Sequence, residues 1–223
     1  MMSIPSVQFF GIWGSSNSNI FAVGNNNMSA SDGRIYHYNG AVWSMELDTN
    51  TSLKAVWGGG ANDVFAAGFY GIVLHYNGDV WTQIRSNQCV PDPGWLCREI
   101  IYGIWGVSGD DFYIAGTTRR QVDDPHVEVY NYDPLVQRCI GHQYWLEEMS
   151  MPESPGYDSL ICDAIWGTSG TDIFVAARDI SSGSVMYHYD GTGWTIIGNG
   201  MGADIWGASS TEVYAIGGTG VLY

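Results

Sequence analysis

The sequence predicts an all-β protein built from five similar units. The segment GIWGSSNSNIFAVG at 11–24 recurs four more times, so that Trp-Gly pairs begin at Trp13, Trp57, Trp105, Trp166 and Trp206. A second block of the HYNGxxW type follows in most units, and 30 glycines accompany 10 Trp and 14 Tyr, which indicates tight turns between aromatic strands. Four antiparallel strands in about 45 residues are typical of a propeller blade. We therefore predict a five-bladed β-propeller of four-stranded antiparallel blades, its fifth blade incomplete.

Each unit is expected to contain four strands, A to D. Strand A is apolar and ends at Trp-Gly, strand B is of the DVFAAG type at 63–68, and strand C is of the IVLHY type at 72–76. Strand D starts at the Trp that follows Asn-Gly or Asp-Gly, dipeptides that favour a type I′ hairpin turn because both central residues need positive φ. Strands B and C are apolar almost throughout, which predicts burial on both faces of each blade.

The third and fifth units depart from this pattern. In the third unit we expect strand C at 127–133 (VEVYNYD) and an insertion at 134–144 before strand D. The fifth unit starts a strand C at GVLY, 220–223, and has no segment for strand D, because 6–10 aligns with strand A of the first unit. This predicts a three-stranded fifth blade, or a piece of a longer protein, with an open edge that could pair with another copy.

The repeats are expected to start near residues 7, 51, 99, 160 and 201 of one domain, 1–223. The strand, Asn-Gly or Asp-Gly turn and Trp arrangement at 71–81 resembles the Asp-box (BNR) repeat of sialidase-like propellers. Its five units are similar to five-bladed tachylectin-type lectins. The block H-Y-N/D-G-x-x-W is one residue tighter than the Asp box and lacks its Ser. The resemblance implies this architecture and does not imply an activity.

His37, His75 and His188 occupy equivalent positions in strand C of three units, with Asn131 in the third unit. Strand C lies two strands, roughly 10 Å, from the central tunnel, and the three histidines belong to different blades, so they cannot converge on one ion. We expect buried, hydrogen-bonded packing histidines, each holding the adjacent hairpin, and no metal and no cofactor. His126 and His142 lie in inserted segments and receive no role.

Acidic residues recur where strand B begins. Asp63, Asp111 and Asp172, with Asn19 and Glu212 in the other units, are expected to cap the A-to-B turn by accepting hydrogen bonds from local backbone N–H groups.

Extra residues gather on one face of the predicted ring. The D-to-A and B-to-C connections share that face and contain the long segments 85–98, 149–159, 25–32, 117–126 and 178–183. Function on a repeat scaffold is usually found in such loops. The candidate ligand-binding residues on this face, arginines for a polar or anionic group and aromatics for stacking, are Trp95, Arg98, Arg119, Arg120, Tyr157 and Arg178. The alternative is that these arginines only pair with neighbouring acids.

The net charge of −15, from 8 basic and 23 acidic residues, argues against nucleic acid or an anionic membrane as partner. No apolar stretch has the length of a membrane span, and no signal peptide is visible, so we expect a cytoplasmic protein, or an extracytoplasmic one if a signal is missing. No nucleophile-elbow, zinc-protease or P-loop motif occurs.

The leading functional prediction is a non-enzymatic binding module for a glycan or a peptide. The alternatives are a protein-interaction scaffold, self-assembling through the open fifth blade, and a glycosidase-type hydrolase, for which the 23 acids single out no pair. Among the cysteines, Cys89 and Cys97 bracket one D-to-A loop and are expected to form a disulfide. Cys139, expected in the insertion on the opposite face, and Cys162, in strand A, are expected not to pair.

Overall fold

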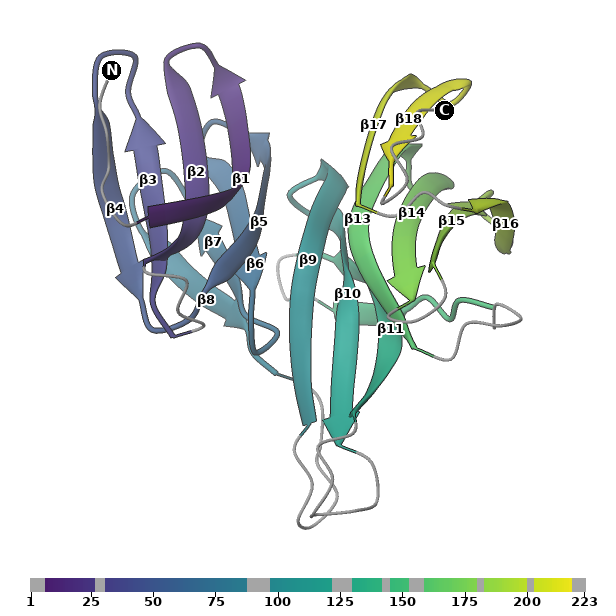
Figure 1. Ribbon diagram of the computed structural model, residues 1–223. Helices are drawn as coiled ribbons and strands as arrows, with labels where there is room; N and C mark the ends of the chain where they lie inside the picture. The colour runs from purple at the N-terminus through teal and green to yellow at the C-terminus, as the bar shows by residue number, and fades with distance from the viewer. Residues whose placement is uncertain are drawn as a thin grey trace.

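The computed structural model describes residues 7–26, 31–87, 97–121, 130–141, 145–152, 159–179, 183–199 and 203–217. These residues form four four-stranded antiparallel sheets and a fifth sheet of two strands (Figure 1). The predicted propeller with an incomplete fifth blade is confirmed. No helix in the described part of the chain is both long and apolar enough to cross a membrane.

The chain supplies the strands of each blade in sequence order. The first two blades consist of β1 (Val7–Ser16), β2 (Asn19–Asn26), β3 (Gly33–Tyr38), β4 (Trp43–Thr49), β5 (Leu53–Gly60), β6 (Asp63–Gly68), β7 (Val73–Tyr76) and β8 (Trp81–Arg85). The others consist of β9 (Cys97–Ser108), β10 (Asp111–Gln121), β11 (Tyr130–Ile140), β12 (Trp145–Glu148), β13 (Leu160–Ser169), β14 (Asp172–Asp179), β15 (Gly183–Tyr189), β16 (Trp194–Asn199), β17 (Asp204–Ser209) and β18 (Glu212–Ile216).

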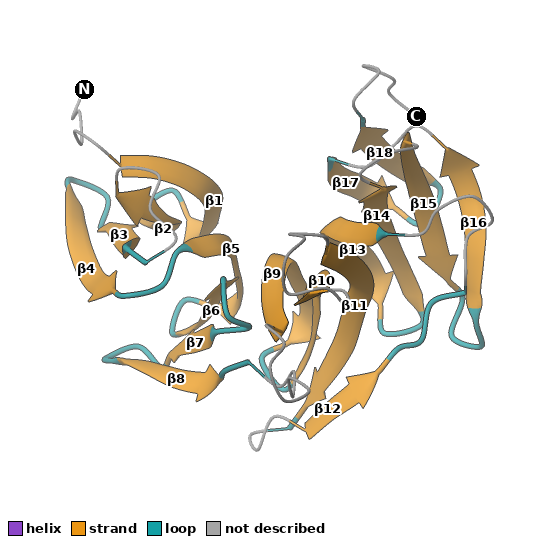
Figure 2. Ribbon diagram, turned by 60° about the horizontal axis from the view of Figure 1, so that its bottom comes forward, coloured by secondary structure: helices purple, strands orange, loops and turns teal. Residues whose placement is uncertain are grey.

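Strand A of each blade packs on strand A of the next, so that β1, β5, β9, β13 and β17 line the inner side of the assembly (Figure 2). The second, third and fourth strands follow outward in each complete blade. Strand B is enclosed between neighbouring blades: β6 is buried from Val64 to Gly68, and β14 is buried from Ile173 to Ala177. Burial on both faces explains why these segments are apolar at successive positions rather than at alternate ones.

The Trp-Gly pair is the contact that joins one blade to the next. The Trp13 ring lies against Gly58 of the second blade, where a Cβ atom would come within 2.6 Å of the ring. The same contact joins the later blades, with Trp57 on Gly106, Trp105 on Gly167 and Trp166 on Gly207. Glycine is required because carbon atoms in ordinary contact are about 3.5–4.0 Å apart.

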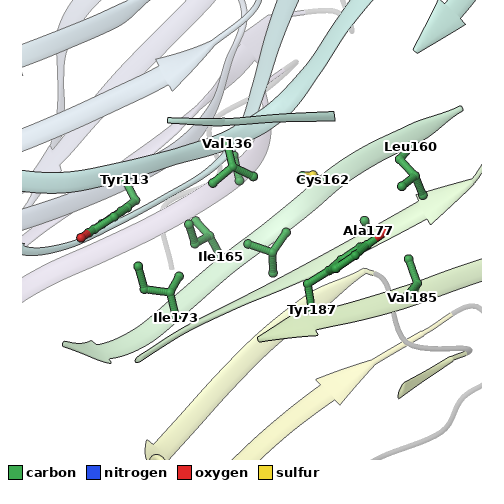
Figure 3. Packing of buried hydrophobic residues seen from close by; sticks show 11 residues of the cluster. Tyr113, Val136, Leu160, Cys162, Ile165, Ile173, Ala177, Val185 and Tyr187 are labelled. Atoms are coloured by element: carbon green, nitrogen blue, oxygen red, sulfur yellow. The ribbon is translucent and has the colours of Figure 1, made fainter. Parts of the chain in front are cut away.

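Apolar side chains from adjacent blades fill the space between them. Figure 3 shows this packing between the third and fourth blades, where Tyr113 and Val136 approach Ile165 and Ile173. Tyr187, on the third strand of the fourth blade, is fully buried in the same cluster. Each blade pair therefore has its own hydrophobic layer, which is the expected consequence of radially stacked sheets.

The third blade differs from its prediction. Its strand C is β11, which runs through 134–140 and turns at Gly141, whose φ is +69°, before β12 begins at Trp145. Residues 130–133 of the expected strand do belong to β11, whereas 127–129 lie outside the described residues; the expected insertion at 134–144 is wrong, because 134–140 continue the same strand. The sequence NYD resembles the HYN block, but pairing with β10 places Arg138 opposite Tyr113, the position that histidine takes opposite phenylalanine elsewhere.

The C-to-D turns also differ in detail. Gly40, Gly78 and Gly191 have positive φ, whereas the preceding Asn39, Asn77 and Asp190 do not, so the expected type I′ turn is wrong. The first residue acts through its side chain instead: Asn39 Oδ1 accepts hydrogen bonds from the N–H groups of Ala41 and Val42. The connection is therefore a four-residue loop closed by an Asn or Asp side chain.

The fifth blade contributes β17 and β18 to the described structure. Its expected third strand, at 220–223, lies outside the described residues. In Figure 1 the five blades follow one another along an arc, with β17 and β18 far from β1 and β2.

Candidate ligand site

A pocket of about 250 Å³ lies between the third and fourth blades, at the end of the sheets that carries the A-to-B and C-to-D turns. Both blades supply polar and aromatic groups to its wall. The residues that matter for its chemistry are Tyr113, Arg138, Glu147 and Glu148 from the third blade, and Tyr189, Thr192 and Trp194 from the fourth.

Arg138, on β11, is the fixed cation of the pocket. Its Nε and Nη2 donate hydrogen bonds to the two carboxylate oxygens of Asp111, at 2.8 and 2.9 Å. This bidentate pair raises the pKa of Arg138 above its ordinary value, so the guanidinium stays charged. Its carbon centre lies 5.6 Å from the centroid of the Tyr113 ring. Two of its donors are thereby used, and the side chain, one third exposed, still lines the pocket.

Tyr113 occupies the position of the phenylalanine that stacks on histidine in other blades. Its hydroxyl donates a hydrogen bond to the carbonyl of Gly170 in the next blade, at 3.3 Å. Burial, together with the charge of Asp111, raises the pKa of Tyr113 to about 12, so the phenol is neutral at ordinary pH. The pocket therefore lies beside the blade in which a Tyr and an Arg replace the Phe and His of the repeat.

The opposite wall of the pocket is aromatic. Tyr189 and Trp194 lie with ring centroids 5.2 Å apart, and the Tyr189 hydroxyl donates a hydrogen bond to the Gly191 carbonyl at 3.1 Å. The equivalent Trp81 of the second blade packs edge-on against Phe21 of the first, at 5.9 Å. Trp194 is half-buried, so part of its ring is accessible from the pocket.

Two acids and a rigid turn complete the lining. Glu147 and Glu148 are exposed at the end of β12, with Glu147 opposite Arg138 in the ladder. Thr192 is held by Asp190, whose Oδ1 accepts hydrogen bonds from the Thr192 hydroxyl and backbone N–H; these bonds lower the pKa of Asp190 to about 2. An aromatic wall beside a cation and carboxylates can pack on the apolar face of a ligand and bind its hydroxyl groups.

The predicted arginines lie at the other end of the sheets, and the strands extend further than expected. Arg98 is in β9, Arg119 and Arg120 are in β10, and Arg178 is in β14, so all four belong to strands rather than to loops. Arg98 and Arg119 are opposite each other in the β9–β10 ladder. The structure thus gathers the three arginines of the third blade at one end of that sheet.

Several of these arginines already have partners. Arg178 Nε lies 2.6 Å from Asp163 Oδ2, and Arg120 Nε lies 3.2 Å from Asp133 Oδ2. The Arg98 guanidinium lies 5.5 Å from the centroid of the Tyr70 ring. Pairing with neighbouring acids is thus observed for Arg120 and Arg178. Ligand binding at this face stays a prediction.

The Arg119 guanidinium lies 5.9 Å from the centroid of the Tyr132 ring. Burial raises the pKa of Tyr102, and the positive charges of Arg178 and Arg119 partly oppose that rise. Burial also raises the pKa of Asp163 to about 6, against the effect of Arg178. The two aromatic candidates of this face, Trp95 and Tyr157, lie outside the described residues.

The strand-C histidines are packing residues, as predicted, although they are half-buried rather than buried. His37, His75 and His188 stack on the phenylalanine opposite, with centroids 4.4 to 4.5 Å apart, and they lie in three separate blades. The predicted fourth equivalent, Asn131, is wrong, because Arg138 occupies that position. His126 and His142 lie outside the described residues. Within the described segments, no three His, Cys, Asp or Glu side chains gather as a metal site would require.

Two of the acids at the start of strand B accept hydrogen bonds from strand C, and Asp172 also accepts one from the Thr168 hydroxyl beside the A-to-B turn. His75 Nε2 donates to Asp63 Oδ1 at 2.8 Å, and His188 Nε2 donates to Asp172 Oδ1 at 2.7 Å. The predicted capping of backbone N–H groups is instead carried by serine: Ser169 Oγ accepts a hydrogen bond from the Thr171 N–H. A carboxylate is the stronger acceptor, and it pairs with the imidazole donor.

The cysteines are partly as predicted. Cys139 and Cys162 are free and buried, which confirms that they do not pair, and burial raises the pKa of each thiol to about 12. Cys139 lies within β11, so its expected place in an insertion is wrong. Cys97 is disulfide-bonded. Cys89 lies outside the described residues, and its pairing with Cys97 stays a prediction.

The comparisons with known proteins identify a fold. No family model and no curated protein matches the sequence. Among solved structures, the chain is similar to Mala s 1, the major allergen of Malassezia sympodialis, with a TM-score of 0.54, 10% identity, and 95% of this chain and 72% of that one covered.

A second similar structure is the SapL1 lectin in complex with alpha methyl fucoside, with a TM-score of 0.54, 14% identity and coverage of 97% and 79%. YCF48 bound to D1 peptide aligns with a TM-score of 0.46, 14% identity and coverage of 99% and 80%. The chain has a β-propeller fold. At these identities the likeness to the first two structures extends to the fold alone.

Proposed function

We propose that this protein is a carbohydrate-binding module whose ligand occupies the pocket between the third and fourth blades. The observation that carries the proposal is the juxtaposition, in one pocket, of the Tyr189–Trp194 wall with Arg138 and with Glu147, which lies opposite Arg138 in the ladder. Sugars present an apolar C–H face to aromatic rings and vicinal hydroxyls to charged groups. The SapL1 lectin, which has a similar fold and is in complex with a fucoside, supports a glycan as the ligand class.

The arrangement of the two acids favours binding over hydrolysis. Glu147 and Glu148 are consecutive residues of a strand, and successive side chains of a strand point to opposite faces of the sheet. Glycoside hydrolysis requires two carboxyl groups on either side of one bond. We therefore place this protein among binding modules, with a peptide as the alternative ligand.

The site proposed here lies at the opposite end of the sheets from the loop-elaborated face. The arginines predicted on that face remain a second candidate, for an anionic group; they are Arg98, Arg119, Arg120 and Arg178. The inter-blade pocket is preferred because its aromatic wall and its charged groups face a common space.

The test is a glycan array with the wild-type protein, followed by calorimetry with the glycans it retains. The variant carrying Glu147→Gln and Glu148→Gln removes only exposed charges, so the fold is expected to persist. Since a hydrogen bond to a charged group contributes about 1.5–3 kcal/mol, the variant should bind at least about tenfold more weakly. The matched control is Glu212→Gln, an exposed acid of the fifth blade, which should bind as the wild type does.

Two results would overturn the proposal. One is an array on which no glycan is enriched; enrichment from a peptide library would then favour the peptide alternative. The other is glycan binding that the two Glu→Gln substitutions leave unchanged, which would place the ligand elsewhere.

A further inference from the structure

The first and fifth blades each expose one face that is covered by a neighbouring blade elsewhere in the structure. Trp206 is 62% exposed, whereas the other four tryptophans of the Trp-Gly pairs are half-buried against the next blade. Beside it on the fifth blade, Tyr214 and Ile216 are 47% and 48% exposed. The residues equivalent to Tyr214 are at most 5% exposed; they are Phe21, Phe65, Tyr113 and Phe174. The outward face of the fifth blade therefore has an apolar surface of the kind that is covered elsewhere in the molecule.

The first blade has the complementary face. Ile12 is 69% exposed, whereas the residues that precede Trp in the other units are 7 to 9% exposed; they are Val56, Ile104, Ile165 and Ile205. Gly14 is equivalent to the four glycines that receive a tryptophan ring, yet all the atoms nearest to an added Cβ at Gly14 belong to its own blade. The first blade thus has the receiving surface of the repeat without a tryptophan on it.

The chain does not bring these two faces together within its described residues. β17 packs on β13, but no comparable packing joins β17 or β18 to β1 or β2 in that part of the chain, and Figure 1 shows the two pairs at opposite ends of the arc.

We propose that the fifth blade of one copy of this protein packs on the first blade of a second copy, repeating the contact that joins successive blades within the chain. Trp206 would lie on the partner's Gly14, as Trp13 lies on Gly58. Tyr214 would contact the partner's Tyr38 and Trp43, as Phe21 contacts Tyr76 and Trp81, with ring centroids 5.5 and 5.9 Å apart. The partner's Ile12 would be buried.

A second copy is the occupant that the structure favours, because each copy contains both halves of the contact. Four blade-to-blade contacts within one chain already show that these residue types pack together. The contact joins two different surfaces, so it is head-to-tail: copies joined this way form a ring if the rotation closes and an open array if it does not. This proposal involves the end blades only and is independent of the glycan pocket.

The test is sedimentation over a range of concentrations without glycan, using one variant for each face. Trp206→Ala removes the tryptophan of the fifth blade, and Ile12→Asp places a charge on the receiving face of the first. Both positions are exposed, and circular dichroism would verify the fold of each variant. The matched control is Val107→Asp, since Val107 is 53% exposed at the end of β9 and belongs to neither end face.

The wild type should associate as concentration rises. Each face variant should weaken association at least about 30-fold, the effect of losing a central aromatic or apolar residue of an interface, while the control behaves as the wild type does. A mixture of the two face variants should form a one-to-one dimer and nothing larger, because Ile12→Asp keeps an intact fifth-blade face and Trp206→Ala keeps an intact first-blade face.

The proposal would be overturned by a wild type that stays monomeric at every soluble concentration. A monomer in which acrylamide fails to quench Trp206 fluorescence, judged against Trp206→Ala, would show that another part of the chain covers this face. Association that survives in Trp206→Ala, or a mixture that stays monomeric, would also contradict the head-to-tail contact.

Discussion

Replacing Gly58 by alanine should destabilise the protein, whereas the same replacement at Gly14 should not. The two glycines hold equivalent positions, after the tryptophan of the second and the first unit. At Gly58 the new Cβ would lie 2.6 Å from the nearest atom of the Trp13 ring and 2.8 Å from two others. An ordinary carbon contact is about 3.5–4.0 Å, so the ring and the blade that carries it must move by about 1 Å. Such overpacking costs about 1–3 kcal/mol.

At Gly14 the nearest atoms are Ile20 Cγ1 at 3.0 Å and the Asn19 carbonyl oxygen at 3.1 Å, so a shift of a few tenths of an ångström suffices. Alanine also lowers the conformational entropy of the unfolded chain, which raises the free energy of unfolding by about 0.4–1 kcal/mol. We therefore expect Gly58→Ala to be about 2 kcal/mol less stable than Gly14→Ala. For a chain of this length that corresponds to a difference of about 4–8 °C in Tm.

Urea unfolding followed by tryptophan fluorescence would measure both variants, at a concentration low enough for the chain to be monomeric. Equal free energies of unfolding for the two variants would refute the view that the tryptophan of one blade is seated on the glycine of the next. A larger loss at Gly14 would show that Gly14 is covered as tightly as Gly58.

Three further predictions concern buried polar groups. Arg85 Nη1 donates to Glu99 Oε2 at 3.1 Å, both side chains being 4% exposed, so Arg85→Met should lower the free energy of unfolding by about 3–5 kcal/mol. Adding Glu99→Gln should restore part of that loss in urea unfolding; an additive second loss would contradict the pairing. Burial raises the pKa of Asp163 to about 6, above its unfolded value, so the folded state binds more protons and this group's contribution to stability falls as pH rises from about 4 to 6. Asp163→Asn should remove that decline, and thermal melts across this range would reveal an unchanged slope if the reasoning fails. Cys139 and Cys162 should not react with a thiol reagent at pH 8 until the protein is unfolded, and rapid labelling of the native protein would contradict their burial.

Local sequence features were sufficient for most of the fold. Turn residues and aromatic spacing identify the strands because a glycine with positive φ, such as Gly78, and the tryptophan that follows it impose the same local geometry in the first, second and fourth units. The alignment of strand C in the third blade was predicted wrongly because local resemblance misled there. Its NYD segment resembles the repeat locally, but hydrogen bonding to β10 places Arg138, not Asn131, opposite Tyr113.

The candidate site was not predictable from the sequence. Its wall comes from β10, β11, β12, β15 and β16, and no spacing along the chain brings Arg138 and Glu147 beside Trp194. One signal was available: the third unit lacks the His-Tyr pair that precedes the turn in the first, second and fourth units. That absence marks the blade beside the pocket, although it says nothing about which residues converge there.

The sequence by itself determined the all-β class, the number of units and the recurrence of the Trp-Gly pair, because these depend on residues close together in the chain. Only the tertiary structure decided which of the repeated tryptophans is covered by a glycine of the next blade. Trp166 and Trp206 stand in the same local sequence, yet Trp166 is seated on Gly207 and Trp206 is exposed. The difference lies in the neighbouring blade, since burial depends on what packs against a residue and not on the residue itself.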